Sequence, residues 1–266
     1  MEFEHVSVLL QESVDWLVTD PDGIYVDCTL GGAGHSQKIA SLLSVRGRLI
    51  GIDQDEEALA AAQERLAKAA CRVDIVKANF KDLASVLSRL QVQAVNGVLF
   101  DLGVSSHQLD MAERGFSYMH DGPLDMRMDQ QTEKTAAFVV NTYSEEALAD
   151  LIWRYGEERW HKRIAQFIVL TRQKAPLTTT FQLVDVIKKA IPKGARKDGP
   201  HPAKRTFQAL RIEINDELGI LEQAVDDAIS ALVSGGRIGV ITFQSLEDRI
   251  VKQKLAQLAK GCTCPP

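Results

Sequence analysis

Acidic residues end three apolar runs in the N-terminal half of the chain, and a glycine cluster follows the first of them. Asp27 precedes Cys-Thr-Leu-Gly-Gly-Ala-Gly-His, which ends at His35, while Asp53 and Asp101 end the other two runs. An acid at the end of a buried strand is suited to accept hydrogen bonds from ribose hydroxyls. Glycines let the backbone approach a ligand closely. The pattern therefore favours a ligand that contains a nucleoside.

The glycine cluster does not complete the fingerprint of dinucleotide-binding proteins. Gly32 and Gly34 fill its first two glycine positions, and Gln37 stands at the third. The full motif holds a pyrophosphate, so its absence favours a smaller adenosine ligand. An ordinary strand-to-helix turn is the alternative. Asp53 argues against that alternative, because it lies one strand–helix–strand unit after Asp27.

Several neighbouring side chains extend the list of candidates. Asp101 opens the segment Asp-Leu-Gly-Val-Ser-Ser, in which Ser105 and Ser106 offer hydroxyl groups. These serines lack the small-residue elbow of a hydrolase nucleophile, so acyl transfer is not expected. Phe80 follows the third predicted strand, where it can stack on a purine or pack in the core. His35 begins a helix and either contacts the ligand or caps a solvated helix end.

Composition limits the class of protein. The chain has 266 residues, of which 45% are hydrophobic and 25% charged, as in globular proteins that need no membrane. It lacks an apolar run of the roughly 18 residues that a membrane span requires, and it does not begin like a secretory signal. Its four cysteines do not form a disulfide framework, and Cys262 and Cys264 lack a partner pair for a metal. We therefore expect a cytoplasmic protein without a membrane or metal site.

The middle of the chain is basic although the whole chain carries a net charge of −5. Residues 107–205 hold 16 Lys and Arg against 13 Asp and Glu. Within them, residues 188–205 carry seven basic residues against the single acid Asp198. The segment also contains glycines and prolines, which is typical of a mobile loop that contacts phosphates. A solvated linker with incidental charge is the alternative.

Hydrophobic periodicity predicts an α/β fold with a second domain. Strands and helices alternate up to residue 102, which predicts a parallel sheet with right-handed crossovers. Residues 106–127 are expected to form a loop, and four helices are expected to follow. A long helix over 207–232, a strand over 236–243 and a last helix then resume the alternation. The predicted domains are 1–106 with 206–266, and an inserted helical domain over 107–205. Few residues follow the last helix, so we expect either a sheet that lacks the hairpin closing many such sheets or a truncated chain.

Taken together, these motifs resemble the MraW-type (RsmH) methyltransferases, which modify the N4 amine of a cytosine in 16S ribosomal RNA of the small subunit. The resemblance covers nearly the whole chain. It rests on segments 27–36, 101–106, 113–117, 121–129, 155–159, 205–211 and 245–249. It implies a Rossmann-like class I methyltransferase core with an inserted all-helical domain, and S-adenosylmethionine as cofactor. The cofactor contacts that it implies are Ala33, Gly34, His35, Asp53, Phe80, Asp101 and Gln108.

Two residues and one segment depart from the family pattern. Ala33 stands where the family often has glycine, and Gln244 stands where it usually has histidine before Ser-Leu-Glu-Asp-Arg. A proton-handling role for that histidine therefore does not carry over to this chain. The C-terminal segment of the family, with its last strand, is missing from the sequence.

For catalysis we expect Asp101, Ser105 and Ser106 to accept the N–H groups of the target amine. Arginines and lysines of the insert are expected to contact the RNA, with the target base outside its stack. These residues are Arg127, Lys193, Arg196, Lys197, Lys204 and Arg205. The alternatives are a methyltransferase for another nucleic acid or a protein, and a catalytically inactive RNA-binding relative. The sequence determines neither the target nucleotide nor the oligomeric state, so a homodimer stays open.

Overall fold

The computed structural model describes residues 7–196 and 200–260, and the chain divides into two compact units. The first unit takes the residues up to Gly103 and those from Leu218 onward, and the second takes Val104–Glu217. The sequence placed the corresponding junctions after residues 106 and 205. No helix in the described ranges is long and apolar enough to cross a membrane.

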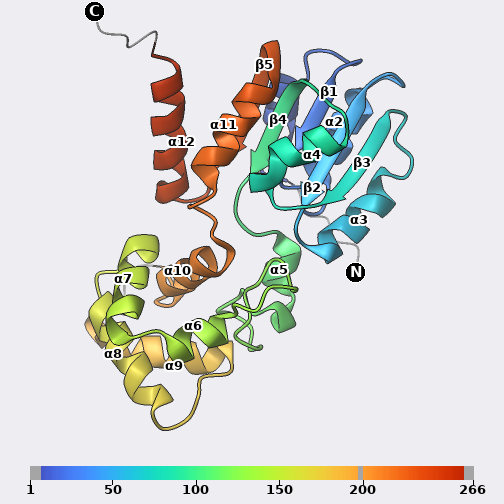
Figure 1. The fold of residues 1–266 in the computed structure, drawn as a ribbon. Helices are drawn as coiled ribbons and strands as arrows, with labels where there is room; N and C mark the ends of the chain where they lie inside the picture. The colour runs from blue at the N-terminus through green and yellow to red at the C-terminus, as the bar shows by residue number, and fades with distance from the viewer. Residues whose placement is uncertain (1–6, 197–199, 261–266) are drawn as a thin grey trace, which may run out of the picture. The chain divides into compact units, whose positions relative to one another are not determined.

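A parallel five-stranded sheet forms the centre of the first unit (Figure 1). Its order is β3-β2-β1-β4-β5, so the order reverses between β1 and β4. The strands are β1 (Ile24–Asp27), β2 (Arg48–Asp53), β3 (Arg72–Lys77), β4 (Val95–Asp101) and β5 (Leu232–Ile241). This parallel α/β arrangement confirms the predicted fold class. In such sheets, ligands bind at the carboxyl ends of the strands beside the point of reversal.

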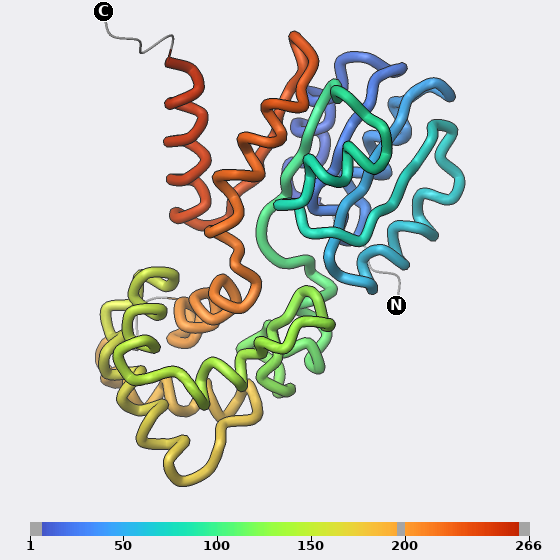
Figure 2. Tube along the Cα trace, viewed as in Figure 1, coloured from blue at the N-terminus to red at the C-terminus, as the bar shows by residue number. Residues whose placement is uncertain are grey.

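Helices cover both faces of this sheet (Figure 2). Each face buries its own apolar cluster. One face carries α1 (Leu10–Leu17), α2 (Gly34–Leu42) and α3 (Glu56–Leu66). The other carries α4 (Leu83–Arg89), α11 (Leu221–Ala231) and α12 (Ser245–Leu258). The inner strands β1, β2 and β4 are mostly apolar runs because both of their faces are buried.

The predicted helix over 207–232 was wrong, because two helices and a break occupy that range. Helix α10 (Lys204–Asn215) ends where Asp216 adopts a left-handed conformation with φ of 50°, and α11 begins at Leu221. Left-handed backbone ends a helix because its next residue leaves the helical path. The break coincides with the junction between the two units at Glu217. Strand β5 also begins earlier than expected, at Leu232.

The second unit is built from helices around one apolar cluster. They are α5 (Ser106–Asp110), α6 (Ala136–Thr142), α7 (Glu145–Gly156), α8 (His161–Arg172), α9 (Thr180–Ala190) and α10. The expected loop over 106–127 was wrong at its start, where α5 and a short 3₁₀ helix (Ala112–Arg114) form. The basic segment 188–205 is likewise not one loop, because α9 continues to Ala190 and α10 begins at Lys204.

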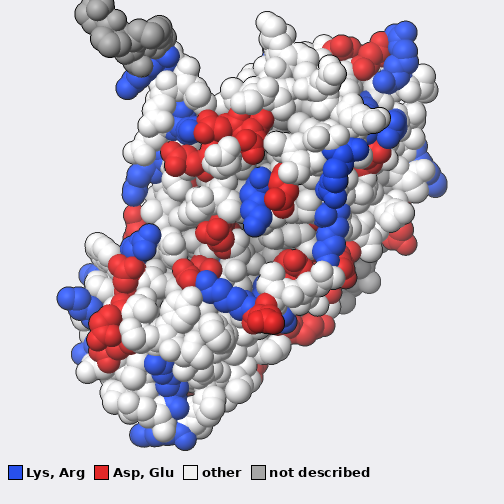
Figure 3. Space-filling model, viewed as in Figure 1, with Lys and Arg blue, Asp and Glu red and all other residues white. Residues whose placement is uncertain are grey.

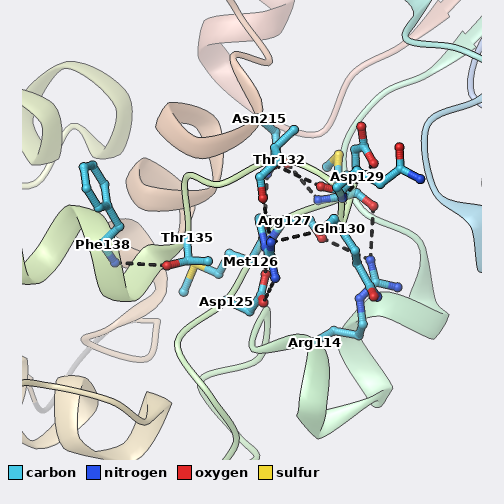
Figure 4. Close-up of polar contacts among 12 residues, drawn as sticks. Arg114, Asp125, Met126, Arg127, Asp129, Gln130, Thr132, Thr135, Phe138 and Asn215 are labelled. Atoms are coloured by element: carbon cyan, nitrogen blue, oxygen red, sulfur yellow. Dashed lines mark hydrogen bonds and ion pairs between the residues drawn. The ribbon is translucent and has the colours of Figure 1, made fainter.

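A network of polar contacts orders the irregular stretch before α6 (Figure 4). Buried Arg114 donates to the carbonyls of Arg127 and Met128. Met126 is fully buried with φ of 63°, so it needs outside support for its left-handed backbone. Asn215 supplies that support, because its amide nitrogen donates to the Met126 carbonyl at 2.9 Å and its oxygen accepts from the Met128 N–H at 2.8 Å.

Replacing Asn215 with alanine should lower the free energy of unfolding of the second unit by about 2–3 kcal/mol. The change leaves a buried carbonyl and a buried N–H without their partners, which is costlier than losing exposed hydrogen bonds. Urea denaturation monitored by circular dichroism measures the change. Gln173→Ala, an exposed amide in the same unit, should stay within about 0.5 kcal/mol of the unmodified chain. Equal effects of the two substitutions would contradict the role given to Asn215.

Candidate functional site

The register of the sheet sets how deeply each strand-end acid is buried. Asp27 at the end of β1 pairs with Gly51 of β2 and with Leu99 of β4. Both neighbouring strands therefore run two residues beyond β1 and end at Asp53 and Asp101. Asp27 is 1% exposed, whereas the side chain of Asp101 is 24% exposed. The two outer acids are thus the ones placed to meet a ligand.

Asp27, which lies deeper in the sheet than the other two acids, holds the chain that follows β1. One carboxylate oxygen accepts from the Ser36 hydroxyl at 2.7 Å, and the other accepts from the Thr29 N–H at 3.2 Å. Burial raises its pKa, while the hydrogen bond from Ser36 and the nearby His35 act in the opposite direction. Both oxygens hold the chain that leaves β1, so Asp27 fixes the glycine turn rather than the ligand.

The glycine turn is tied to the second strand-end acid. The N–H of Gly31 donates to one oxygen of Asp53 at 2.8 Å, and the N–H of Asp55 donates to the other at 2.9 Å. Burial raises the pKa of Asp53 to about 6, although these two backbone hydrogen bonds lower it. Each carboxylate oxygen has a further lone pair for a hydroxyl donor. Asp53 can therefore position the turn and still accept from a ribose.

Two residues of the turn show why it is built from small side chains. A Cβ atom on Gly34 would clash with the Ser7 hydroxyl, so a larger residue there would force the Ser7 side chain to move. Ala33 is fully buried with φ of 59°, a left-handed conformation that favours glycine. It is the N-cap of α2 but has no side chain that can cap the helix. The partial positive charge of this helix end is open to a negatively charged ligand group.

His35 joins the turn to the third strand-end acid. Its imidazole is 4% exposed, with Nε2 3.1 Å from the Val8 carbonyl oxygen and Nδ1 3.5 Å from Oδ2 of Asp101. A carbonyl only accepts, so Nε2 carries a proton and donates it to Val8. Nδ1 is therefore the ring nitrogen that faces Asp101.

Asp101, like Asp53, is a partly exposed carboxyl whose pKa is raised. Burial raises its pKa to about 6, His35 acts to lower it, and the charges of Asp27 and Glu247 raise it further. Its backbone N–H donates to the Thr29 hydroxyl at 2.6 Å. Its Oδ1 atom is buried and has no hydrogen-bond donor among the described residues. An unpaired buried acceptor is costly and points to a ligand group that donates to it.

Phe80 has a mixed environment. It begins the 3₁₀ helix Phe80–Asp82 after β3 and is partly buried. Its ring packs edge-to-face on Phe100, with 5.8 Å between ring centroids. Phe80 therefore packs against the core of the first unit and remains partly exposed.

Ser105, Ser106 and Gln108 belong to the second unit, whereas Asp101 belongs to the first. The Ser105 hydroxyl accepts from the Gln108 N–H at 3.2 Å, and the Gln108 side chain accepts from the Ser105 N–H at 3.1 Å. This reciprocal capping box fixes the start of α5. Ser105 is thus occupied as a helix cap, while Ser106 is half-buried. The short chain segment that joins the two units is what links these side chains to Asp101.

The residues expected to contact RNA differ in how many hydrogen bonds their side chains make within the protein. Arg127 donates through Nε and Nη2 to both oxygens of Asp125, and through Nη1 to the carbonyls of Gln130 and Thr132 (Figure 4). The N–H groups of its guanidinium thus order its own loop, and few of them remain to bind a phosphate.

The other expected RNA contacts lie in or near the basic segment. Lys193 and Lys204 are exposed, and Arg205 is exposed but donates one bond to the Glu157 carbonyl at 2.6 Å. The Arg196 side chain and Lys197 lie outside the described part of the chain, as do Cys262 and Cys264.

Sequence reasoning missed Glu247 as a member of the site. It is 2% exposed, and its charge reaches Asp101. Its two oxygens accept from the Phe243 N–H at 3.0 Å and from the Gln244 side chain at 2.8 Å. The available signal was its place in the first turn of the helix that follows an apolar strand. An acid there usually serves the helix terminus, so the pattern alone does not reveal a buried carboxylate.

Comparison with known proteins gives one consistent result. The profile of the MraW methylase family matches residues 2–266. A protein of Symbiobacterium thermophilum named ribosomal RNA small subunit methyltransferase H is 58% identical over 266 residues, which are all of this chain and 84% of that protein. A protein of the same name from Clostridioides difficile is 58% identical over 265 residues and 85% of its length. The Brevibacillus brevis protein of that name is 57% identical, again over 85% of its length.

Replacing Asp101 with asparagine should stabilise the ligand-free protein at neutral pH. The folded carboxyl, with a pKa of about 6, keeps its proton where the unfolded carboxyl, with a pKa of about 3.9, has lost it. Its contribution to stability therefore falls as pH rises from about 4 to about 6. Asparagine has no charge to desolvate, so the variant should gain on the order of 1–3 kcal/mol at pH 7.5 and almost nothing near pH 4.

Urea denaturation at the two pH values measures this difference. The free energy of unfolding of the variant minus that of the unmodified protein gives the contribution of one carboxyl. The contributions of the other titrating groups cancel to first order. A stability difference that is the same at pH 4 and pH 7.5 would show that Asp101 is not desolvated in the folded protein.

Proposed function

The chain belongs to the MraW methylase family, and from that premise we propose that it methylates the N4 amine of a cytosine in 16S ribosomal RNA of the small subunit. S-adenosylmethionine is the proposed methyl donor, and the cytoplasm is the proposed location. The observation that carries the proposal is Asp101, a desolvated strand-end carboxylate with one buried oxygen that lacks a donor among the described residues. The full-length match to the family supports the same reaction class.

The residues at the strand ends fit S-adenosylmethionine. Asp53 offers carboxylate lone pairs for the ribose hydroxyls, and Phe80 presents part of an aromatic ring for the adenine. The uncapped start of α2 at Ala33, Gly34 and His35 suits the carboxylate of the methionine part. Asp101 adds a negative charge for a positively charged ligand. We assign Gln108 to the same site on the family resemblance alone.

When bound, S-adenosylmethionine supplies an electrophilic methyl group on a sulfonium, which the cytosine N4 can take while the thioether leaves. The task of this chain is to hold the amine in line and to keep its lone pair available. In free cytosine that lone pair is delocalised into the ring. An acceptor that binds an amine N–H draws the proton toward itself and returns electron density to nitrogen. We assign this acceptor to Asp101.

Ser105 and Ser106 are proposed to support the amine from the start of α5. After transfer the methylated amine carries one proton too many and is strongly acidic. That proton leaves along its hydrogen bond to Asp101 and passes to solvent, so the site needs no strong base. Alignment of the two reactants within about 3–3.5 Å supplies much of the rate enhancement.

We propose that the second unit, Val104–Glu217, holds the RNA. Its exposed basic side chains include Lys193 and Lys204, which stand on either side of residues 197–199 in the sequence. On the face drawn in Figure 3, Lys and Arg alternate with Asp and Glu and do not form one broad basic patch. On this face, the phosphate contacts are therefore expected to be few and local. A homodimer and recognition of the assembled subunit rather than free RNA stay proposals.

Transfer of tritium from labelled S-adenosylmethionine tests the function. Small ribosomal subunits that lack the methyl group, naked 16S RNA and DNA are offered in parallel. We expect label on cytosine N4 of the subunits, and Asp101→Asn should lower the single-turnover rate by about 100-fold or more. Calorimetric titration with S-adenosylmethionine reports separately whether the variant still binds the donor. Label only on DNA or protein would refute the substrate, and donor binding without any transfer would indicate an inactive relative.

Neutralising the exposed lysines should change how RNA binding depends on salt. Each phosphate contact releases counterions, so Lys193→Ala together with Lys204→Ala should reduce the slope of log affinity against log salt by about one to two. Binding of small subunits is measured by filter retention across a salt series. Lys68→Ala, an exposed lysine of the first unit, is the matched control. An unchanged slope for the double variant would contradict the role of this segment.

A further inference from the structure

An exposed aromatic side chain lies at the carboxyl end of β5, next to the strand that ends in Asp101. Asp101 pairs with Ile241, the last residue of β5, and Phe243 follows two residues later. Phe243 is 58% exposed. A Cβ atom placed on Gly103 would lie 3.6 Å from its ring, so the ring rests beside the chain that leaves Asp101. This places an open aromatic surface at the edge where the reaction is proposed.

The next residue, Gln244, has an amide that is half satisfied. Its nitrogen donates to Oε1 of Glu247 at 2.8 Å. Its oxygen is buried and has no donor within the described ranges. The same Glu247 accepts from the backbone N–H of Phe243 at 3.0 Å. Because a carboxylate oxygen only accepts, it forces the nitrogen of the amide toward itself and fixes the oxygen on the other side.

Two buried acceptors that lack donors in the described part of the chain thus come from neighbouring strand ends, one from Asp101 and one from Gln244. Glu247 links them, since it binds Gln244 and its charge acts on Asp101. A buried acceptor left without a donor is destabilising. The arrangement is understandable if a ligand brings two donors on one atom. The exocyclic amine of a cytosine has that form, with two N–H groups on N4 beside a flat ring.

We propose that Phe243 and Gln244 form the base-binding part of the site. Phe243 stacks on the cytosine ring, and the Gln244 oxygen accepts one N–H of the N4 amine while Asp101 accepts the other. This inference rests on the proposed function and names the residues that recognise its target base. A uracil presents a carbonyl oxygen at the same place, which would face two acceptors and leave both unpaired. The two acceptors would therefore favour cytosine over uracil at the same position.

In this proposal both residues contact the substrate base and neither contacts the methyl donor. Stacking on an aromatic ring contributes to holding a base that has left its helix, so loss of Phe243 should weaken substrate binding. Loss of the Gln244 oxygen leaves one N–H without a partner and the lone pair less available. The lost hydrogen bond weakens binding to a smaller degree, and the less available lone pair slows the step after binding. The two residues should therefore affect KM and kcat differently.

Steady-state methylation of unmethylated small subunits tests both assignments. Phe243→Ala should lower kcat/KM about 10–100-fold, mainly through KM, and Phe243→Tyr should stay within about threefold of the unmodified enzyme. Gln244→Met should lower kcat by about 10-fold or more, with a smaller rise in KM. Gln244→His keeps a donor for Glu247 and an acceptor for the amine, and should recover most of the rate. Val45→Ala, an exposed residue shortly before the amino end of β2, is the control.

Two measurements without turnover separate recognition from a structural role. Calorimetric titration should give the same affinity for S-adenosylmethionine in all variants. Subunit binding in the presence of S-adenosylhomocysteine should weaken about 10-fold or more for Phe243→Ala. Unchanged kinetics and subunit binding for Phe243→Ala would overturn the assignment, as would a loss of donor affinity that accounts for its defect. If the unmodified enzyme labels no small subunits, the proposed function itself has failed; if it does label them, these results concern the base pocket alone.

Discussion

The two-residue overhang of β2 and β4 beyond β1 is the constraint on which the site depends. It follows from the pairing of Asp27 with Gly51 and Leu99. In a parallel sheet, a shift by two residues keeps each side chain on the same face and moves it about 7 Å along the strand. The overhang thus lifts Asp53 and Asp101 to the edge and leaves Asp27 below them as a tether.

This arrangement concentrates negative charge where water is scarce. Burial raises the pKa values of Asp53 and Asp101 to about 6, and the buried Glu247 adds to the effect on Asp101. At neutral pH these carboxyls are ionised at a cost in stability, which is common where groups are placed for chemistry rather than for folding. Donors from a cofactor ribose and a substrate amine would offset that cost. The glycine turn participates, because Gly31 and His35 bring it against the same two acids.

The sequence was sufficient for features that depend on local patterns. Apolar runs that end in acids predicted β1, β2 and β4. The helices expected between the strands predicted a parallel sheet, which is the class observed. The break between α10 and α11 was missed because Asp216 carries no glycine-like signal for its left-handed backbone. The sequence also could not predict that Arg127 binds within its own loop. An arginine that donates to carbonyls and one that donates to a phosphate look the same in a sequence. The buried state of Glu247 depends on tertiary packing that periodicity does not encode.

Near pH 6 the strand-end carboxyls Asp53 and Asp101 should be partly protonated, and they should become ionised when the cofactor binds. Calorimetric titration with S-adenosylmethionine at pH 6, in two buffers of different ionisation enthalpy, measures the protons exchanged on binding. Ribose hydroxyl donors and a positively charged ligand both favour the ionised form. Binding should therefore release protons, on the order of one per site. Binding with no proton release at pH 6, or with proton uptake, would contradict the role given to Asp53 and Asp101.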